Sequence, residues 1–327
     1  MHFRTEIELP ESQIQISYTD NTLLLGSCFT ENIGLRLQKA KFKVCTNPFG
    51  ILYNPYSIAS SIGYILGAQQ YTNEDIFEHN QQWHSWDHHG RFSNANPQLL
   101  VYDINKELAS AQALIQNTNY IFITLGAAHV YRLKENGRIV ANCHKVPQKE
   151  FEFKMLEAEE ISEILHQMVR EVHNFKPEIK IIFTISPVKH WAYGALENAL
   201  GKASLRVAIH KIIKQHQSVF YFPAFELITE DLRDYRFYAD DMLHVSDKGI
   251  EYVWGKFQGV WISPESKVLL KRLEQIERAK THRILKPGSV EVQKFAQNTL
   301  QEITNIRKLA PQMDFTNEIE YFTKLMG

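Results

Sequence analysis

Cysteine is scarce in this chain of 327 residues, which has only Cys28, Cys45 and Cys143. Three cysteines without a paired spacing do not make a disulfide framework, and they favour a reducing compartment. No apolar run approaches the roughly 20 residues of a membrane helix. The first residues also lack the continuous apolar segment of a secretory signal. We therefore expect a cytoplasmic protein with no membrane partner.

Net charge is almost absent as well. The 36 Lys and Arg residues are balanced by 37 Asp and Glu residues, which gives a formal charge of −1. This balance lacks the basic footprint that proteins use to bind DNA or RNA, so we expect no nucleic-acid partner. Internal repeats and low-complexity tracts are missing too. What remains is an ordinary globular composition, 44% hydrophobic, with ample material for a core.

Short apolar runs alternate with amphipathic stretches along most of the chain. The runs typical of buried strands are residues 22–25, 41–46, 120–125, 180–186 and 219–222. Helical periodicity covers residues 31–40, 54–67, 105–117, 156–175, 197–215 and 247–257. This alternation predicts the α/β class: a three-layer α/β/α sandwich around a flavodoxin-like parallel sheet, with ligands at the carboxyl edge of the strands.

Two segments depart from this alternation. Residues 70–103 are polar and aromatic without a regular period, and we interpret them as an irregular insertion. Residues 130–133 and 139–142 flank Asn136-Gly137, a strong hairpin signal. We expect one domain over residues 1–260 and a helical C-terminal extension over 261–327, with helices at 263–279, 290–307 and 317–325. Its charged helices could pack on the core or support a homo-oligomer.

Gly26-Ser27 follows the first predicted strand directly, and Phe29 begins the next helical face. Ser27 should therefore sit on a strand-to-helix turn beside backbone N–H groups and the positive end of a helix dipole. A nucleophile of an acyl-transfer enzyme needs that setting. The alternative is a plain helix N-cap. Cys28 could also replace Ser27 as the nucleophile, although a small buried residue is the simpler interpretation.

Asp241 and His244 supply the partners that such a serine requires. They lie three residues apart in a loop ahead of the last core helix. A turn there would let the carboxylate fix the imidazole tautomer, so that His244 could act as the base. By itself this spacing is also typical of a surface turn. Its place after the last strand of the predicted sheet favours the catalytic interpretation.

These motifs together resemble the SGNH/GDSL hydrolase superfamily, and more narrowly the GSCFA domain family, a bacterial branch of it. The name of the family matches Gly26-Ser27-Cys28-Phe29, with Thr30 where the name has alanine. Other matching stretches are residues 47–55, 83–87, 142–145, 186–190 and 232–238. The resemblance covers roughly residues 20–260 and does not extend to the tail.

The resemblance implies ester chemistry in an SGNH-type α/β/α sandwich without a cofactor. Ser27 matches the nucleophile, His244 the base and Asp241 the residue that orients it. The Gly50 N–H matches the group that joins the Ser27 N–H in the oxyanion hole. The superfamily suggests a small-molecule or glycan ester as substrate, with a small acyl group such as acetyl, and either hydrolysis or acyl transfer.

One departure from the superfamily pattern concerns the third strand. Where relatives carry Gly-x-Asn-Asp, this chain has residues 126–129 with the sequence GAAH. The asparagine that completes the oxyanion hole is therefore missing, and one lost donor can cost roughly 3 kcal/mol of transition-state stabilisation. Asn142 and His129 are the candidate substitutes. Alternatively, the scaffold serves as a non-catalytic binding module.

Aromatic and histidine side chains in the insertion and after the fourth strand are candidate substrate contacts. Trp83, His84 and Trp86 could form a lid that stacks on a sugar ring, and His129 and His190 could bind substrate from the strand ends. The alternative is an insertion anchored by tryptophan packing with solvated histidines. The histidines lack the tight spacing of zinc ligands, so we predict no metal site and keep a metal-dependent hydrolase as the least favoured hypothesis.

Overall fold

A five-stranded parallel sheet forms the centre of the computed structural model, which describes residues 4–282, 284 and 288–326. Its strands are β1 (Asn21–Gly26), β2 (Lys43–Thr46), β5 (Thr118–Leu125), β9 (Lys180–Ile185) and β10 (Val219–Tyr221). They are arranged in the order β10-β9-β5-β1-β2. In chain order this is 2-1-3-4-5, the flavodoxin-like arrangement that the sequence predicts.

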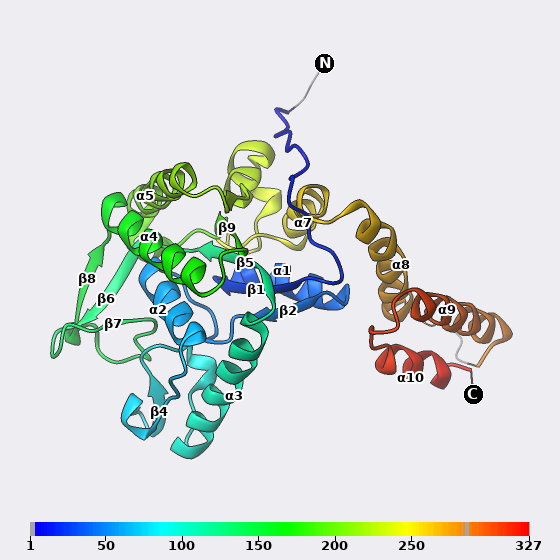
Figure 1. The fold of residues 1–327 in the computed structure, drawn as a ribbon, viewed down its shortest axis with the longest axis horizontal. Helices are drawn as coiled ribbons and strands as arrows, with labels where there is room; N and C mark the ends of the chain where they lie inside the picture. The colour runs from blue at the N-terminus through cyan, green and yellow to red at the C-terminus, as the bar shows by residue number, and fades with distance from the viewer. Residues whose placement is uncertain (1–3, 283, 285–287, 327) are drawn as a thin grey trace.

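Helices cover both faces of the sheet, so the three-layer prediction is confirmed (Figure 1). One face carries α2 (Pro55–Leu66), α3 (Pro97–Ile115), α4 (Ala158–Phe175) and α5 (Gly194–Gln215). The other face carries α1 (Cys28–Lys39) and α7 (Asp247–Trp261). No helix in the described ranges is both long enough and apolar enough to cross a membrane.

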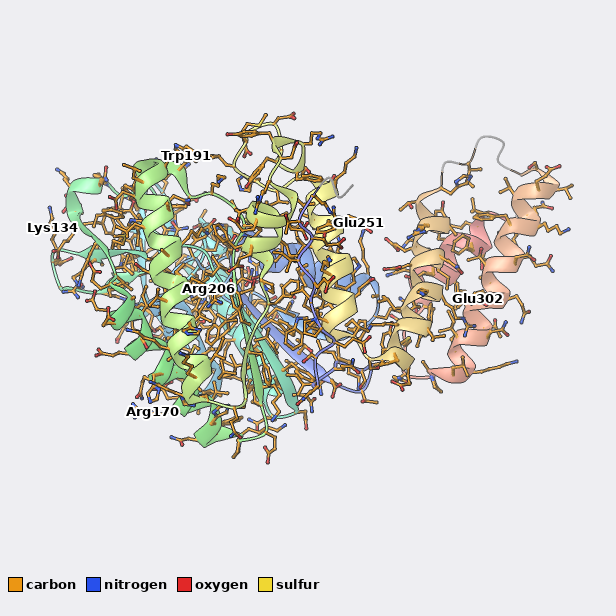
Figure 2. The ribbon with its side chains drawn as sticks, turned by 90° about the horizontal axis from the view of Figure 1, so that it is seen from above. Lys134, Arg170, Trp191, Arg206, Glu251 and Glu302 are labelled. Atoms are coloured by element: carbon orange, nitrogen blue, oxygen red, sulfur yellow. The ribbon has the colours of Figure 1, made fainter. Side chains whose placement is uncertain are left out.

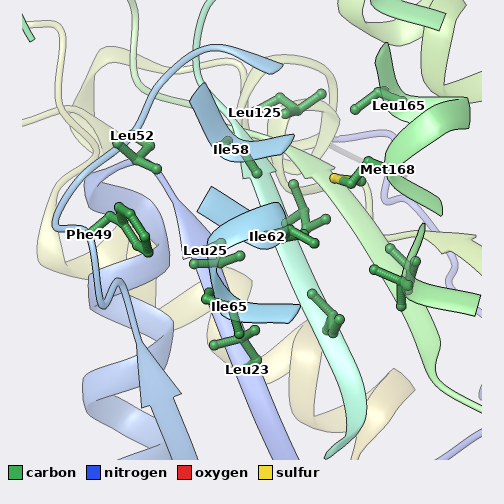
Figure 3. Packing of buried hydrophobic residues seen from close by; sticks show 14 of the residues in the cluster. Leu23, Leu25, Phe49, Leu52, Ile58, Ile62, Ile65, Leu125, Leu165 and Met168 are labelled. Atoms are coloured by element: carbon green, nitrogen blue, oxygen red, sulfur yellow. The ribbon is translucent and has the colours of Figure 1, made fainter. Parts of the chain in front are cut away.

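Side chains of β1 alternate between two hydrophobic clusters, as the pleat of a strand requires. Leu23 and Leu25 pack with α2 to α5, and Figure 3 shows them beside Ile62 and Phe49. Leu24 points to the opposite cluster, which α1 and α7 complete. Because both faces are buried, the strand reads as a continuous apolar run in the sequence.

The insertion contains more regular structure than we predicted. Two four-residue strands, β3 (Ile76–His79) and β4 (Gln82–Ser85), form an antiparallel hairpin, and α3 begins at Pro97, well before residue 105. The prediction of an irregular segment over 70–103 is therefore wrong. Such short strands of mixed polarity show no period. The start of α3 is marked by Asn96, whose Oδ1 accepts the Gln98 and Leu99 N–H groups, and by Pro97 at the first helical position.

The predicted Asn136-Gly137 hairpin is confirmed and gains a third strand. β6 (His129–Leu133) pairs with β7 (Ile139–Val140) and with β8 (Phe151–Met155), both antiparallel. The short helical segments are η1 (Asn73–Asp75), η2 (Gly90–Phe92), η3 (Gln148–Glu150), η4 (Trp191–Tyr193), α6 (Ala224–Glu226), η5 (Leu227–Leu232) and η6 (Tyr235–Phe237).

Three helices form the C-terminal tail: α8 (Pro264–Thr281), α9 (Val290–Leu309) and α10 (Thr316–Lys324). Figure 2 shows Glu302 on this bundle, well away from Arg206 on α5. The tail helices nevertheless share the hydrophobic cluster of α1 and α7, and Lys41 pairs with Glu318 at 3.1 Å. The tail thus packs against its own core. Division of the chain at residue 260 and association of copies through the tail stay predictions.

Candidate active site

Ser27 occupies the strand-to-helix turn predicted for it. β1 ends at Gly26, whose φ of +137° suits glycine, and a Cβ there would lie 2.2 Å from Thr124 O. Ser27 caps α1, its Oγ accepting the Phe29 N–H at 3.3 Å. Only 1% of Ser27 is exposed, and its N–H donates to Thr124 O at 3.3 Å. The hydroxyl therefore lies at a helix N-terminus, is buried, and has an N–H group beside it that already has an acceptor.

Asp241 and His244 form the hydrogen-bonded pair that their spacing predicts. His244 Nδ1 lies 2.6 Å from Asp241 Oδ2, and because a carboxylate only accepts, Nδ1 carries the proton. Asp241 Oδ1 also accepts the backbone N–H groups of His244 and Leu243, each at 2.9 Å. These backbone hydrogen bonds, with that of the imidazole, lower the pKa of Asp241 to about 2. The pair thus leaves the neutral imidazole with a lone pair on Nε2.

The loop that carries this pair attaches to the carboxyl edge of the sheet. Lys189 N–H, after the end of β9, donates to Leu243 O at 3.1 Å. β9 is separated from β1 by β5 alone, so Ser27 and the loop share one edge about two strand spacings, roughly 10 Å, apart. Among the described residues, Ser27 Oγ has no hydrogen bond with His244. The direct pairing of hydroxyl and imidazole stays a prediction.

Gly50 lies in the turn after β2, as predicted, with φ of +76°. Its N–H donates to Asn47 O at 2.7 Å and so closes the turn, which means that this N–H already has an acceptor. Asn142 uses Oδ1 to accept a backbone N–H at 2.8 Å. No protein acceptor among the described residues binds its Nδ2, which faces Gly90 in the insertion. Asn142 therefore keeps a spare amide donor, while the oxyanion roles of both residues stay predictions.

The three predicted lid residues are engaged within the insertion itself. His84 Nδ1 is bonded to Ser93 Oγ at 2.6 Å and Nε2 to His79 O at 3.1 Å, so both ring nitrogens are occupied. Trp86 stacks on Phe77 with ring centroids 3.6 Å apart. Trp83 is half-buried against the main hydrophobic cluster. These contacts support the anchored-loop alternative, and a substrate role for the three side chains stays a prediction.

His129 and His190 lie beyond the ends of β5 and β9. The His129 ring packs against Phe153 and Tyr193, at centroid distances of 4.9 Å and 5.2 Å, and these two rings stack on each other at 3.9 Å. His129 Nε2 lies 3.7 Å from Glu197. Burial lowers the pKa of His129, and the glutamate offsets part of that effect. Burial also lowers the pKa of His190, with a further contribution from the nearby His129. The two histidines thus form a mostly neutral, aromatic-lined part of the edge.

Lys202 is the residue at this edge that the sequence interpretation missed. It lies on α5 and is 4% exposed, and Nζ donates to Gly126 O at 2.6 Å and to Ser186 O at 2.8 Å. A signal was present, since Lys202 precedes the buried Leu205 by three residues and so falls on the apolar face of its helix. A lysine in that position is unusual enough to mark a site.

No group of three or more histidine, cysteine, aspartate or glutamate side chains within the described ranges is arranged to hold a metal ion. Several histidines instead have structural contacts. His88 stacks on Phe49 with centroids 4.6 Å apart and bonds Ser85 Oγ at 2.9 Å, and burial lowers its pKa to about 3. The metal-dependent hypothesis therefore gains no support from the arrangement of these residues.

Comparison with known proteins matches the chain to two family models. The model of the GSCFA family covers residues 21–257. The model of the GSCFA domain protein, C-terminal domain, covers residues 273–326. No curated protein matches the chain.

Three solved structures resemble parts of the fold at low identity. A carbohydrate esterase family 3 protein from Talaromyces cellulolyticus is 12% identical with a TM-score of 0.37, covering 77% of this chain and 98% of its own. The acetyl xylan esterase Est2A from Butyrivibrio proteoclasticus is 8% identical with a TM-score of 0.37, covering 79% and 66%. The family 3 carbohydrate esterase from Clostridium thermocellum is 11% identical with a TM-score of 0.32, covering 78% and 98%. These likenesses are too distant to decide an activity.

Proposed function

Because the chain belongs to the GSCFA family, we propose that it is a serine-dependent ester hydrolase or acyltransferase. Ser27 attacks the carbonyl of a small acyl ester, and His244 takes the hydroxyl proton and later returns it to the leaving group. The acyl-serine then passes its acyl group to water or to an acceptor hydroxyl. A carbohydrate ester is the proposed substrate class, by analogy with the SGNH esterases that the motifs resemble.

The Asp241–His244 pair is the observation that carries this proposal. A 2.6 Å hydrogen bond from Nδ1 to the carboxylate holds the imidazole in the one tautomer that leaves Nε2 able to accept a proton. The carboxylate is kept ionised by two backbone donors at 2.9 Å. That is the arrangement a general base and its orienting group require.

A small rearrangement at Ser27 would make the hydroxyl available. Its Oγ and N–H take part in hydrogen bonds of 3.3 Å each, slightly longer than a typical N–H···O bond. Rotation about χ1 would release Oγ from the Phe29 N–H. The side chains of Asp241 and His244 are both exposed, so neither is packed into the core.

A fluorophosphonate probe tests the proposal without knowledge of the substrate. We expect the probe to label the wild-type protein and the Cys28→Ala variant, and to leave Ser27→Ala unlabelled. Cys28 is the matched control because it is the next residue and the alternative nucleophile, although burial raises the pKa of its thiol and disfavours the reactive thiolate. Labelling that persists in Ser27→Ala, or is absent from wild type, would overturn the assignment.

The second candidate function is a non-catalytic binding module on the same scaffold. The burial of the site favours a binding module, because Ser27 is 1% exposed and the N–H groups of Ser27 and Gly50 both donate to backbone carbonyls. A protein that binds glycan esters with a measurable affinity, and that the probe never labels, would have this function.

A further inference from the structure

The Lys202 ammonium joins the ends of two strands at the candidate active site. Gly126 directly follows β5 and Ser186 directly follows β9, and Nζ donates to the carbonyl oxygens of both. Lys202 lies one helical turn before Arg206, which is labelled on α5 in Figure 2. The side chain thus reaches inward from the covering helix to the edge where strand ends and ligand-binding loops meet.

Close packing of α5 makes this reach possible. A Cβ on the neighbouring Gly201 would lie 3.5 Å from Ala128 Cβ and 3.6 Å from the His129 ring, so the helix touches the segment after β5. That segment is the one in which relatives carry the oxyanion asparagine. The small residues Gly201 and Ala128 bring the helix, and with it Lys202, to the place that lacks the amide.

The charge of Lys202 has no carboxylate partner among the residues that the structure describes. The groups that face it are the Cys28 thiol from α1, Lys189 and His190 from the segment after β9, and the Phe225 ring, whose centroid lies 5.9 Å from Nζ. Burial lowers the pKa of Lys202 to about 7. A buried, unpaired cation is costly to maintain, and two carbonyl dipoles offset that cost only in part.

Ser27 follows β1, the strand next to β5, and Lys202 binds the carbonyl just after the end of β5. The Ser27 N–H donates to Thr124 O of β5, two residues before Gly126, and β5 is hydrogen-bonded to β1. Adjacent strands lie about 5 Å apart, so the ammonium and an oxyanion formed at Ser27 would be separated by roughly 5–10 Å. At this distance in a mostly apolar site, a positive charge still interacts strongly with a developing negative charge.

We propose that Lys202 is a positioning residue that replaces the absent strand-three asparagine: its buried ammonium holds the ends of β5 and β9 and stabilises, as a nearby positive charge, the oxyanion formed at Ser27. This inference rests on the proposed serine chemistry. The negative charge of the tetrahedral intermediate is then the transient counter-ion that Lys202 lacks in the resting protein. The interaction is stronger in the transition state than in the ground state, as catalysis requires.

The proposal makes the reactivity of Ser27 depend on the charge of Lys202. Below pH 7 the ammonium is charged and stabilises the oxyanion. Above about pH 7 it loses its proton, so the rate of Ser27 labelling by the fluorophosphonate should fall. In Lys202→Met this high-pH decline should disappear, and the rate at pH 6.5 should be about ten- to a hundredfold lower than in wild type. Lys202→Arg, which stays charged throughout this pH range, should restore most of the rate and show no decline above pH 7.

Lys176→Met is the matched control. Lys176 Nζ donates to Thr118 O at 3.0 Å and to Gln116 O at 3.3 Å, so it makes a similar two-carbonyl tie at the opposite end of β5. This variant should keep the wild-type rate and pH profile. Melting temperatures of all variants distinguish lost reactivity from lost folding, and the wild-type pH profile tests the proposal even if Lys202→Met does not fold.

The outcomes separate this inference from the proposed function. If wild type is never labelled at Ser27, the serine chemistry fails and the role of Lys202 fails with it. If wild type is labelled but its rate stays level above pH 7, the inference alone is overturned. The inference is likewise overturned if Lys202→Met matches wild type, or if Lys176→Met loses as much.

Discussion

Asp241→Asn is the substitution that most directly probes the proposed base. The asparagine Oδ1 can still accept the backbone N–H groups of Leu243 and His244, which Asp241 accepts at 2.9 Å. Its NH₂ group, however, would face His244 Nδ1, where a carboxylate now accepts the proton at 2.6 Å. The imidazole would have to place its proton on Nε2 instead, and a protonated Nε2 cannot take a proton from Ser27.

The expected loss follows from this tautomer change. We expect kcat, or the rate of fluorophosphonate labelling at Ser27, to fall by about 10³–10⁴-fold, the size of effect that the same change has in a Ser-His-Asp triad. The melting temperature should stay close to that of wild type because the pair is exposed. The carboxylate has its pKa lowered to about 2, so it stays ionised above that pH and its protonation cannot explain any loss of activity near pH 5.

Asp240→Asn is the control for this experiment, since Asp240 is the exposed neighbour in the same loop. It should leave both rate and melting temperature unchanged. The reasoning is refuted if Asp241→Asn retains wild-type reactivity while folded, or if Asp240→Asn loses as much activity.

Two further predictions concern stability. Gly50→Ala should lower the free energy of unfolding by about 1–3 kcal/mol in urea titrations, because φ is +76° and the new Cβ would lie 2.4 Å from His89 Cβ. Gly63→Ala, in open space on α2, should instead raise the free energy of unfolding by about 0.5–1 kcal/mol. Equal effects of the two substitutions would contradict this account. His88 is buried neutral with its pKa lowered from 6.5 to about 3, so its stabilisation is complete above pH 6.5 and is lost as pH falls toward 3. The contribution of His88 to that loss should reach about 1.4 kcal/mol per pH unit. His88→Phe should remove this contribution and leave that of His144, whose pKa burial also lowers to about 4. His210→Ala, where the histidine is exposed, should leave the slope unchanged, and a slope that is the same in His88→Phe as in wild type would show that His88 is not responsible.

The elements that could be predicted are those with a strong local signal. β1 is a buried apolar run, and the turn at Gly26-Ser27 follows because a strand that stops at glycine beside a helical face has few alternatives. The Asp241–His244 pair was also accessible to prediction, since its members lie three positions apart in a tight turn. Each of these features depends on contacts between residues close in the chain, which spacing alone describes.

The insertion shows why other features could not be predicted. The strands β3 and β4 are four residues each, too short for a period. His144, from a distant segment, packs on Phe77 and His84 and bonds Ser85 O at 2.8 Å. His84 has the sequence context of a side chain available for substrate, yet Ser93 and His79 occupy both of its nitrogens. A histidine in a polar stretch has the same sequence signature whether it is free or fully bonded, so only the coordinates distinguish the two.

By itself the sequence determined the α/β class, the order of the five strands of the central sheet, and the local geometry around Ser27 and His244, because periodicity, caps and turn spacing are properties of neighbouring residues. Only the tertiary structure decided which groups meet at the carboxyl edge. It placed Lys202 on Gly126 O and Ser186 O, across separations of 76 and 16 residues, and it closed the Ser27 and Gly50 turns onto backbone acceptors. Those contacts depend on how closely a helix can pack on a sheet, which small residues such as Gly201 permit and which no local pattern encodes.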